Sequence, residues 1–194
     1  MHMAKPNVKE QIVTASMTLL HSKGFNATSV QDITEAAGVP KGSFYNHFAS
    51  KEELGVEVLQ RYSDQAGQLG IRLGESSLPP REWLRGYFGQ LIEANVASEF
   101  NAGCMLGNFS TELSNQSPAI RQQARQSFAA MCAMLEQVIG QGQRDGGIAT
   151  TQPARELANF TADAWQGAVL RAKAEQDRAP LDRFIDMVLN RVLV

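Results

Sequence analysis

The chain has 194 residues, of which 43% are hydrophobic and 20% charged, and its formal net charge is −2. This length and apolar content are enough for one small domain beside a larger helical core. The sequence pI of about 5.9 excludes a strongly basic protein that binds nucleic acid over its whole surface. Because the chain has no run of about eighteen apolar residues and no apolar signal sequence, we expect a cytoplasmic protein without a membrane span.

The N-terminal quarter of the chain predicts a series of short helices. An apolar stripe at helical spacing predicts a first helix that begins near Val8 and ends before Gly24. A second helix is expected to begin at Thr28, whose hydroxyl would form a capping box with Gln31. Gly38 then supplies the residue best suited to a positive φ after a helix. One helix therefore stops shortly before the next one starts.

The next helix is predicted from Pro40 to Phe48. At about 100° per residue, Phe44 and Phe48 share a stripe that faces the core, whereas the outward face is small, polar and rich in hydrogen-bond donors. Two short helices around a tight turn, with such a surface on the second, are typical of a helix-turn-helix DNA-binding unit. The alternative is a purely structural corner between two helices.

Several residues of this segment are candidates for contacting DNA. Gly42 lets the backbone come close to DNA, while Ser43 and Asn46 carry groups that can read base edges. The side chains that can reach phosphate oxygens are Tyr45, His47 and Lys51.

The segment from about Val8 to Leu59 contains a dense set of motifs: Lys23-Gly24-Phe25, Thr28-Ser29-Val30, Ile33, Ala36, Gly38-Val39, Lys41-Gly42-Ser43, Phe44-Tyr45, His47-Phe48 and Lys51-Glu52. With these residues it resembles the DNA-binding domain of the tetracycline-repressor (TetR) family. The resemblance implies an all-α, homodimeric transcription factor, usually a repressor, that binds a pseudopalindromic operator in double-stranded DNA. It also implies a helix-turn-helix domain at 1–52 and a larger helical domain at 53–194 for dimerisation and binding of a small-molecule inducer.

The resemblance also assigns roles by position. It implies that Lys41, Gly42 and Ser43 begin the recognition helix and that Thr28 contacts the DNA backbone. Asn46 departs from the family, which often has an aromatic residue there, so it is either a base reader or a bystander.

The rest of the chain continues the helical pattern. Ser50 and Glu53 form a second capping box that would open a helix from Lys51 to about Gly70. Further helices are expected from residue 81 to about 100 and over 118–139, 153–176 and 181–194, with a loop at 76–80 and a glycine-rich stretch at 140–147. In the TetR family the last two helices of each subunit form the dimer interface.

The segment 101–109, together with 112–121, resembles a TetR branch with a Gly-Cys motif, some of whose members respond to reactive electrophiles. Gly103 before Cys104 is consistent with a helix start, where free N–H groups lower the pKa of a thiol. No cationic residue lies next to Cys104 in sequence, so activation would need a residue from elsewhere. The alternative is a small buried hydrophobic residue. Cys132 lies in an apolar helix where packing explains it, and a redox pair of the two cysteines is the remaining alternative.

An inducer site is expected among the helices of the C-terminal part, with Cys104 as one of its ligand contacts. Asn108 or Gln166 would serve as a polar anchor. The alternative is that aromatic residues at helical spacing only fill the core. The candidate walls are Trp83, Tyr87, Phe88, Phe109, Met131 and Trp165.

An enzyme is the competing class of protein. All three histidines precede residue 48, no phosphate-binding GxxxxGK motif occurs, and no metal-ligand spacing is present, so we expect neither catalysis, nor a cofactor, nor a metal. A further alternative is a helical ligand-binding or scaffold protein with little affinity for DNA, against which the presence of Lys41, Tyr45, His47 and Lys51 argues.

Overall fold

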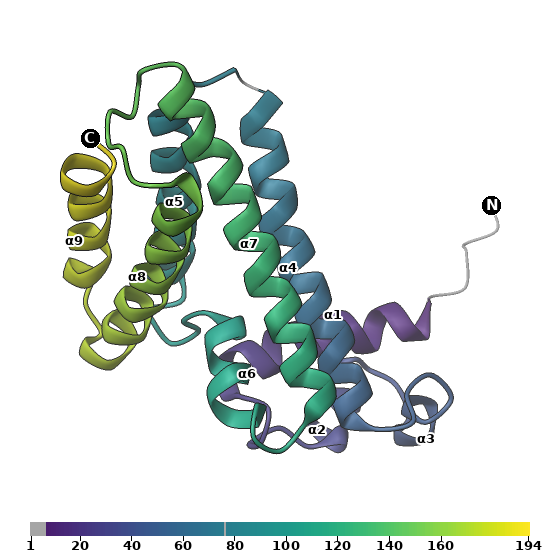
Figure 1. Ribbon diagram of the computed structural model, residues 1–194. Helices are drawn as coiled ribbons and strands as arrows, with labels where there is room; N and C mark the ends of the chain where they lie inside the picture. The colour runs from purple at the N-terminus through teal and green to yellow at the C-terminus, as the bar shows by residue number, and fades with distance from the viewer. Residues whose placement is uncertain (1–6, 76) are drawn as a thin grey trace, which may run out of the picture.

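The computed structural model describes residues 7–75 and 77–194, and every regular element in this part of the chain is a helix (Figure 1). The all-α prediction is therefore confirmed. Residues 1–6 of the expected N-terminal domain and Ser76 of the expected loop lie outside the described residues. The helices are α1 (Val8–Lys23), α2 (Val30–Ala36), α3 (Lys41–Phe44), α4 (Lys51–Glu75), α5 (Pro80–Ala97), α6 (Met105–Leu113), α7 (Pro118–Arg144), α8 (Ala154–Glu175), α9 (Ala179–Met187) and the π-helix η1 (Val188–Val192).

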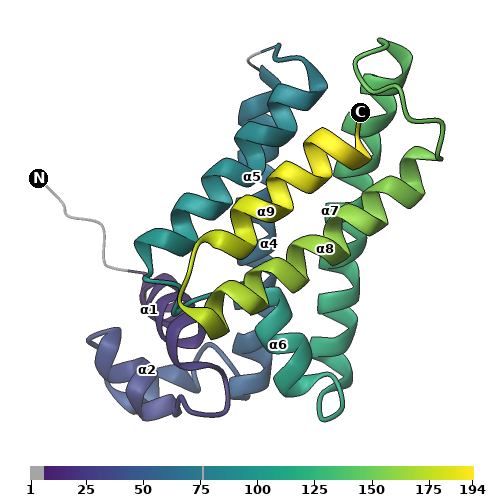
Figure 2. The same ribbon diagram turned by 90° about the vertical axis from the view of Figure 1, so that its left-hand side faces the viewer.

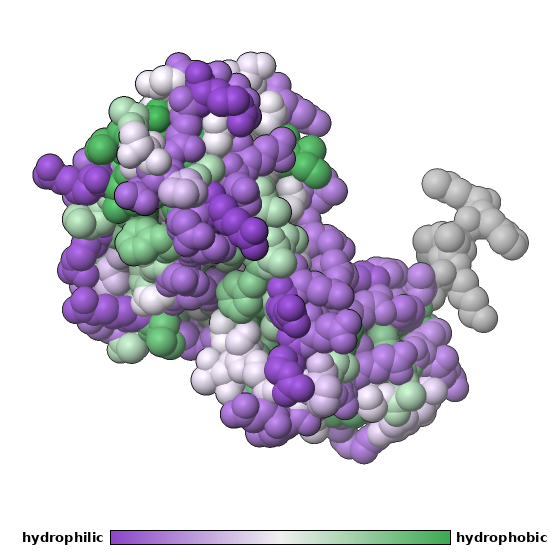
Figure 3. Space-filling view, viewed as in Figure 1, coloured by the Kyte–Doolittle hydropathy of each residue, from purple (hydrophilic) through white to green (hydrophobic). Residues whose placement is uncertain are grey.

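Helices α1, α2 and α3 form a small unit, here called the N-terminal head, at one end of the long helix α4 (Figure 1). Phe44 and Phe48 are both buried, with their ring centres 5.7 Å apart, as the predicted apolar stripe required. Helix α3 is shorter than predicted because the N–H groups of His47 and Phe48 both bond the carbonyl of Phe44, which closes the helix in a turn. The surface of the head is mostly hydrophilic, at the lower right of Figure 3.

The N-terminal cap of α2 differs from the prediction by one residue. Ser29 Oγ accepts the N–H of Asp32 at 3.1 Å, and the Asp32 carboxylate accepts the N–H of Ser29 at 2.7 Å. The capping box is thus Ser29 with Asp32, and the predicted pairing of Thr28 with Gln31 is wrong. Thr28 and Ser29 both carry a hydroxyl that can cap a helix. Ser29, which is exposed, caps α2, whereas the side chain of Thr28 is buried.

The larger part of the molecule is built around α4 and α7, which run side by side (Figure 1). Helices α8 and α9 lie together on its outer side, with α5 next to them (Figure 2). Ser50 Oγ caps the start of α4 through the N–H of Glu53, as predicted, whereas the Glu53 carboxylate accepts from Ala49. No helix of the described residues combines the length and the apolar character that crossing a bilayer requires.

Two helices run through glycines that the sequence suggested would end them. Helix α4 continues past Gly70 to Glu75, and α7 continues past Ile139 to Arg144. A Cβ at Gly142 would lie 2.6 Å from Ile148 Cδ1. This glycine therefore lets the following loop fold back onto α7, and its role is close packing and not termination.

Two glycines of α4 should respond in opposite ways to an added methyl group. A Cβ at Gly67 would meet nothing within 4 Å, whereas one at Gly55 would lie 2.8 Å from the Phe25 ring. We expect Gly67→Ala to raise the free energy of unfolding by about 0.5–1 kcal/mol through helix propensity. We expect Gly55→Ala to lower it by about 1–3 kcal/mol through overpacking. Urea denaturation of both variants measures the difference, and a stabilised Gly55→Ala would contradict the packing at the head.

Candidate DNA interface and ligand cavity

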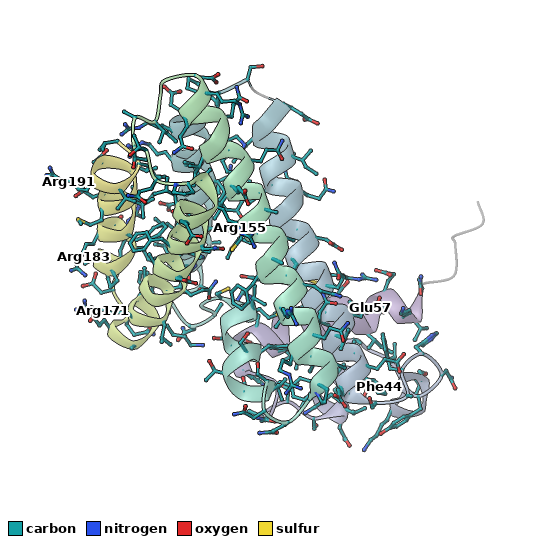
Figure 4. The ribbon with its side chains drawn as sticks, viewed as in Figure 1. Phe44, Glu57, Arg155, Arg171, Arg183 and Arg191 are labelled. Atoms are coloured by element: carbon teal, nitrogen blue, oxygen red, sulfur yellow. The ribbon has the colours of Figure 1, made fainter. Side chains whose placement is uncertain are left out.

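The N-terminal head presents the predicted DNA contacts of α3 and the turn after it on one outward surface. Lys41, Gly42, Tyr45, Asn46 and His47 are exposed, and Tyr45 retains 58% of its accessible surface. This orientation follows from the burial of the two phenylalanines that flank the segment, one of which Figure 4 labels within the head. Ser43, at the edge of the same surface, is half-buried. Side chains that carry hydrogen-bonding groups thus project from a supported helix and the turn after it, which suits a major groove.

Thr28 does not belong to this surface, contrary to the sequence-based prediction. Its side chain is 1% exposed and its hydroxyl donates to the carbonyl of Gly24 at 2.8 Å. Its backbone N–H donates to the carbonyl of Phe25. Since both donors are used inside the head, Thr28 has no group left for a phosphate, and the predicted contact is corrected to a structural role.

Lys51 is committed mainly to the fold. Its Nζ donates to the carbonyls of Phe25 at 2.9 Å and Thr28 at 2.8 Å, and it lies 4.2 Å from the centre of the Phe25 ring. Burial lowers the pKa of Lys51, although Glu112 and Asp32 oppose this shift. Two of the three ammonium protons are thus used, and one remains for a phosphate oxygen.

The turn between α1 and α2 joins the head to the rest of the molecule. The Glu112 carboxylate of α6 accepts the N–H of Phe25 at 3.3 Å and the N–H of Asn26 at 2.9 Å. Gly24 has a φ of 83°, and a Cβ there would lie 2.6 Å from Glu112 Oε1. Helix α6 therefore binds the amide side of this turn, while Lys51 of α4 binds its carbonyl side.

A cavity of about 460 Å³ lies between α4, α5, α6, α7 and α8. Its volume falls within the usual range for small-molecule sites, and most of its lining is apolar. The polar anchor Gln166 also borders it. Five of the predicted ligand contacts line it: Trp83, Tyr87, Cys104, Met131 and Trp165.

Three predicted ligand contacts lie outside this cavity. Phe88 packs against Trp165 and Phe184, with ring centres 5.3 and 4.8 Å away, and is 1% exposed. Phe109 is fully buried and meets the Phe25 ring of the head at 5.7 Å. Asn108 donates to the carbonyl of Ala102 at 2.9 Å. Phe88 and Phe109 therefore belong to the hydrophobic core, and the Asn108 amide is bound to the loop before α6.

The sequence reasoning missed the contribution of α4 to the cavity. Tyr62, Ala66 and Gly70 line it, and their spacing of four residues places them on one face of the helix. Gly67 also borders the cavity. The glycines of α4, which suggested a weak helix end, instead leave room for this space, and their helical spacing was the available signal.

Cys104 is the N-cap residue of α6, so the predicted helix start is confirmed. Its Sγ lies 3.7 Å from the Tyr62 hydroxyl and 3.5 Å from Gln166 Nε2, and both groups act as donors. The residue is 9% exposed and its thiol is free. Burial, followed by the neighbouring Cys104, raises the pKa of Tyr62 well above its ordinary value, so this hydroxyl stays protonated. The partners from distant segments that the sequence could not supply are thus Tyr62 and Gln166.

Cys132 lies on α7, half-buried and also free. Burial and then Asp163 raise the pKa of its thiol. A raised pKa lowers the thiolate fraction, so the packing explanation fits Cys132 better than a reactive role.

The head and the cavity together define the class of this protein. A helix-turn-helix unit joined to a helical body that encloses a ligand-sized space is the architecture of a DNA-binding regulator. Comparison with protein families agrees, because residues 12–58 match bacterial regulatory proteins of the tetR family and residues 80–188 match the tetracyclin repressor-like C-terminal domain. The chain belongs to the tetracycline-repressor family and is a DNA-binding transcriptional regulator, not an enzyme.

Relatives with known names cover nearly the whole chain. The HTH-type transcriptional repressor DhaR of Mycobacterium sp. (strain GP1) is 39% identical over 192 residues, which span 98% of this chain and 95% of that protein. The transcriptional regulator AcuR of Cereibacter sphaeroides is 30% identical over 183 residues, or 90% of this chain and 80% of the relative.

Solved structures share the fold. The regulatory protein TetR from Rhodobacter sphaeroides has a TM-score of 0.89 at 26% identity, and the match covers 95% of this chain and 98% of that one. The reduced form of E. coli NemR has a TM-score of 0.84 at 26% identity, and the match covers 95% of this chain and 96% of that one.

The joint at Glu112 gives a direct test of how the head is held. Glu112→Ala removes the acceptor of two backbone N–H groups, so we expect the free energy of unfolding to fall by about 1–2 kcal/mol. We also expect faster hydrogen exchange at the amides of Phe25 and Asn26. Thr111→Ala, one residue earlier on α6 and exposed, is the matched control. Unchanged exchange at both amides in Glu112→Ala would show that the carboxylate does not hold the turn.

Proposed function

We propose that this regulator is a repressor that binds a pseudopalindromic operator as a homodimer, with residues 1–52 as the DNA-binding domain and residues 53–194 as the inducer and dimerisation domain. A small molecule in the cavity, or an adduct at Cys104, releases it from DNA in the cytoplasm. The observation that carries the proposal is that α6 begins at the cavity with Cys104 and ends at the head with Glu112.

The exposed polar surface of α3 supports the DNA-binding part. Lys41, Tyr45 and His47 offer donors for phosphate oxygens, and Ser43 and Asn46 offer groups for base edges. The net charge of −2 means that long-range attraction to DNA is weak. Two heads at a fixed spacing overcome this weakness, because the second contact becomes intramolecular once the first has formed.

The outer side of α8 and α9 supports the dimer. Three large apolar side chains remain exposed there: Phe160 at 51%, Leu170 at 69% and Met187 at 48%. Arg171, Arg183 and Arg191 lie along the same outer side (Figure 4). Apolar residues with arginines around them are typical of protein interfaces, and a second copy of the chain would cover them.

Helix α6 supports the coupling between ligand and DNA. At its first turn, Cys104 shares the cavity wall with Tyr62 of α4. At its last turn, Glu112 holds the α1–α2 turn. Because α6 spans only nine residues, a shift at one end is carried to the other with little loss, and the head changes its position relative to α4.

A competing function is a helical ligand-binding protein with little DNA affinity. In both functions the cavity binds a small molecule, and they differ only in whether the N-terminal head binds DNA. Binding to the DNA upstream of the protein's own gene separates the two, since the competing function predicts no bound complex at any half-site arrangement.

Substitutions on α3 should separate phosphate contacts from base reading. We expect Tyr45→Ala to weaken binding about tenfold on every DNA sequence, because one phosphate contact is lost. We expect Asn46→Ala to change the preference at one base pair by about 1–3 kcal/mol if it reads a base. Fluorescence anisotropy on the upstream DNA and on single-base variants measures both. Undiminished binding by Tyr45→Ala would exclude this surface as the interface.

The thiol route is tested with an α,β-unsaturated ketone. The Cys104 thiolate would add its sulfur to the β-carbon, and the α-carbon would take a proton from water. We expect the ketone to release wild type and Cys132→Ser from DNA but not Cys104→Ser. Release of all three would exclude Cys104 as the sensor. Retention of all three would leave reversible binding in the cavity as the release mechanism.

A further inference from the structure

A second space of about 270 Å³ adjoins the cavity at Cys104. We call the first space the inner chamber and the second the outer chamber. The outer chamber adds the amide side chains of Gln65, Gln90 and Asn95 to the lining. The two chambers share a wall and are therefore neighbours in space, with these residues in common: Tyr62, Ala66, Leu91, Cys104 and Trp165.

The outer chamber carries positive charge that no carboxylate on its lining neutralises. Arg72 is its only lining residue with a permanent charge, and no Asp or Glu lines it. Asp64 borders a neighbouring surface hollow with Arg72, but it accepts a hydrogen bond from Gln60 and forms no ion pair within the described residues. An anion entering this chamber would meet a guanidinium without a competing acid.

A second arginine on the same helix shows the contrast. Arg61 is about three turns before Arg72, so both project from a similar side of α4. Arg61 contacts Glu10 at 2.5 and 2.6 Å and Glu57 at 3.0 Å. The ion pairs of the described residues leave Arg72 out. The charge of Arg61 is used inside the fold, whereas that of Arg72 is available to a ligand.

His21 borders the outer chamber without adding a negative group. Its Nε2 lies 3.0 Å from the carbonyl of Gly103, and its ring meets Tyr62 edge-on at 5.3 Å. Burial lowers the pKa of His21, the bond to Gly103 opposes the shift, and the positive charge of Lys173 adds to it. The charged group that acts on the His21 ring is thus the cation Lys173, and no carboxylate of the described residues acts on it.

We propose that the two chambers form one site for an amphipathic organic anion, whose apolar chain fills the inner chamber and whose carboxylate binds Arg72 in the outer chamber. This inference rests on the proposed function, because it names the class of inducer. The inner chamber offers apolar walls, so chain burial supplies affinity. The guanidinium offers two parallel donors to a carboxylate, so Arg72 supplies selectivity over neutral and cationic molecules of equal length.

Tryptophan fluorescence can report binding directly, because the chain has two tryptophans and both line the inner chamber. The probes are octanoate, 1-octanol and octylamine, which share one chain length. We expect octanoate to bind wild type at least about tenfold more tightly than 1-octanol, which corresponds to about 1.4 kcal/mol, with octylamine weakest. The preference should shrink as the salt concentration rises, because Arg72 is exposed.

Arg72→Gln should bind octanoate and 1-octanol alike, since only the charge is removed. Arg85→Gln is the matched control, because Arg85 is an exposed arginine that lines neither chamber. It should keep the wild-type preference. Equal binding of octanoate and 1-octanol by wild type, a preference that survives in Arg72→Gln, or no binding of any probe would each overturn the proposal.

Release from DNA is measured separately with the same probes. If octanoate binds selectively but the protein never binds its upstream DNA, the proposed repressor function fails and the anion site stands. If the protein binds DNA but shows no preference for the anion, the repressor function stands and the anion site fails.

Discussion

The turn between α1 and α2 is held by two oppositely charged side chains from two different helices, and the position of the N-terminal head depends on it. Glu112 of α6 accepts its N–H groups and Lys51 of α4 donates to its carbonyls. Each bond involves an ionised partner, so each is stronger than a neutral hydrogen bond. Because one helix contributes the negative group and another the positive one, a relative shift of α4 and α6 must lengthen bonds on one side of the turn.

The same two helices form part of the cavity wall. Tyr62 of α4 and Cys104 at the start of α6 are in contact, and both line the inner chamber. In the proposed mechanism, a ligand that separates this pair acts on the two helices that hold the head, about two turns away along α6 at Glu112 and about three turns away along α4 at Lys51. In the proposed mechanism, the cavity and the DNA-binding surface are coupled through these short, hydrogen-bonded segments, without a long-range rearrangement of the core. Phe88 of α5 packs against Trp165 of α8 and Phe184 of α9, and of these three residues only Trp165 lines the cavity.

The selectivity of the proposed anion site arises from an imbalance of charge along α4. Arg61 is neutralised by Glu10 and Glu57, which fix α1 against α4. Arg72 has no such partner in the described ion pairs and faces a chamber without acids. One helix therefore carries a structural arginine near the head and a free one near the ligand space. Exposure to solvent weakens both the ion pairs of Arg61 and the proposed pair of Arg72 with a ligand carboxylate. Arg72 therefore contributes more to the selection among ligands than to the total binding affinity.

The sequence by itself determined the all-α fold, the burial of Phe44 and Phe48 and the polar face of α3, because helical periodicity and turn residues act locally. It also placed Cys104 at a helix start. Only the tertiary structure decided that Ser29 and not Thr28 caps α2, that Phe88 and Phe109 belong to the core, and that Tyr62 and Gln166 reach Cys104. Those outcomes depend on which faces of distant helices meet, and one helix's spacing carries no information about its neighbours.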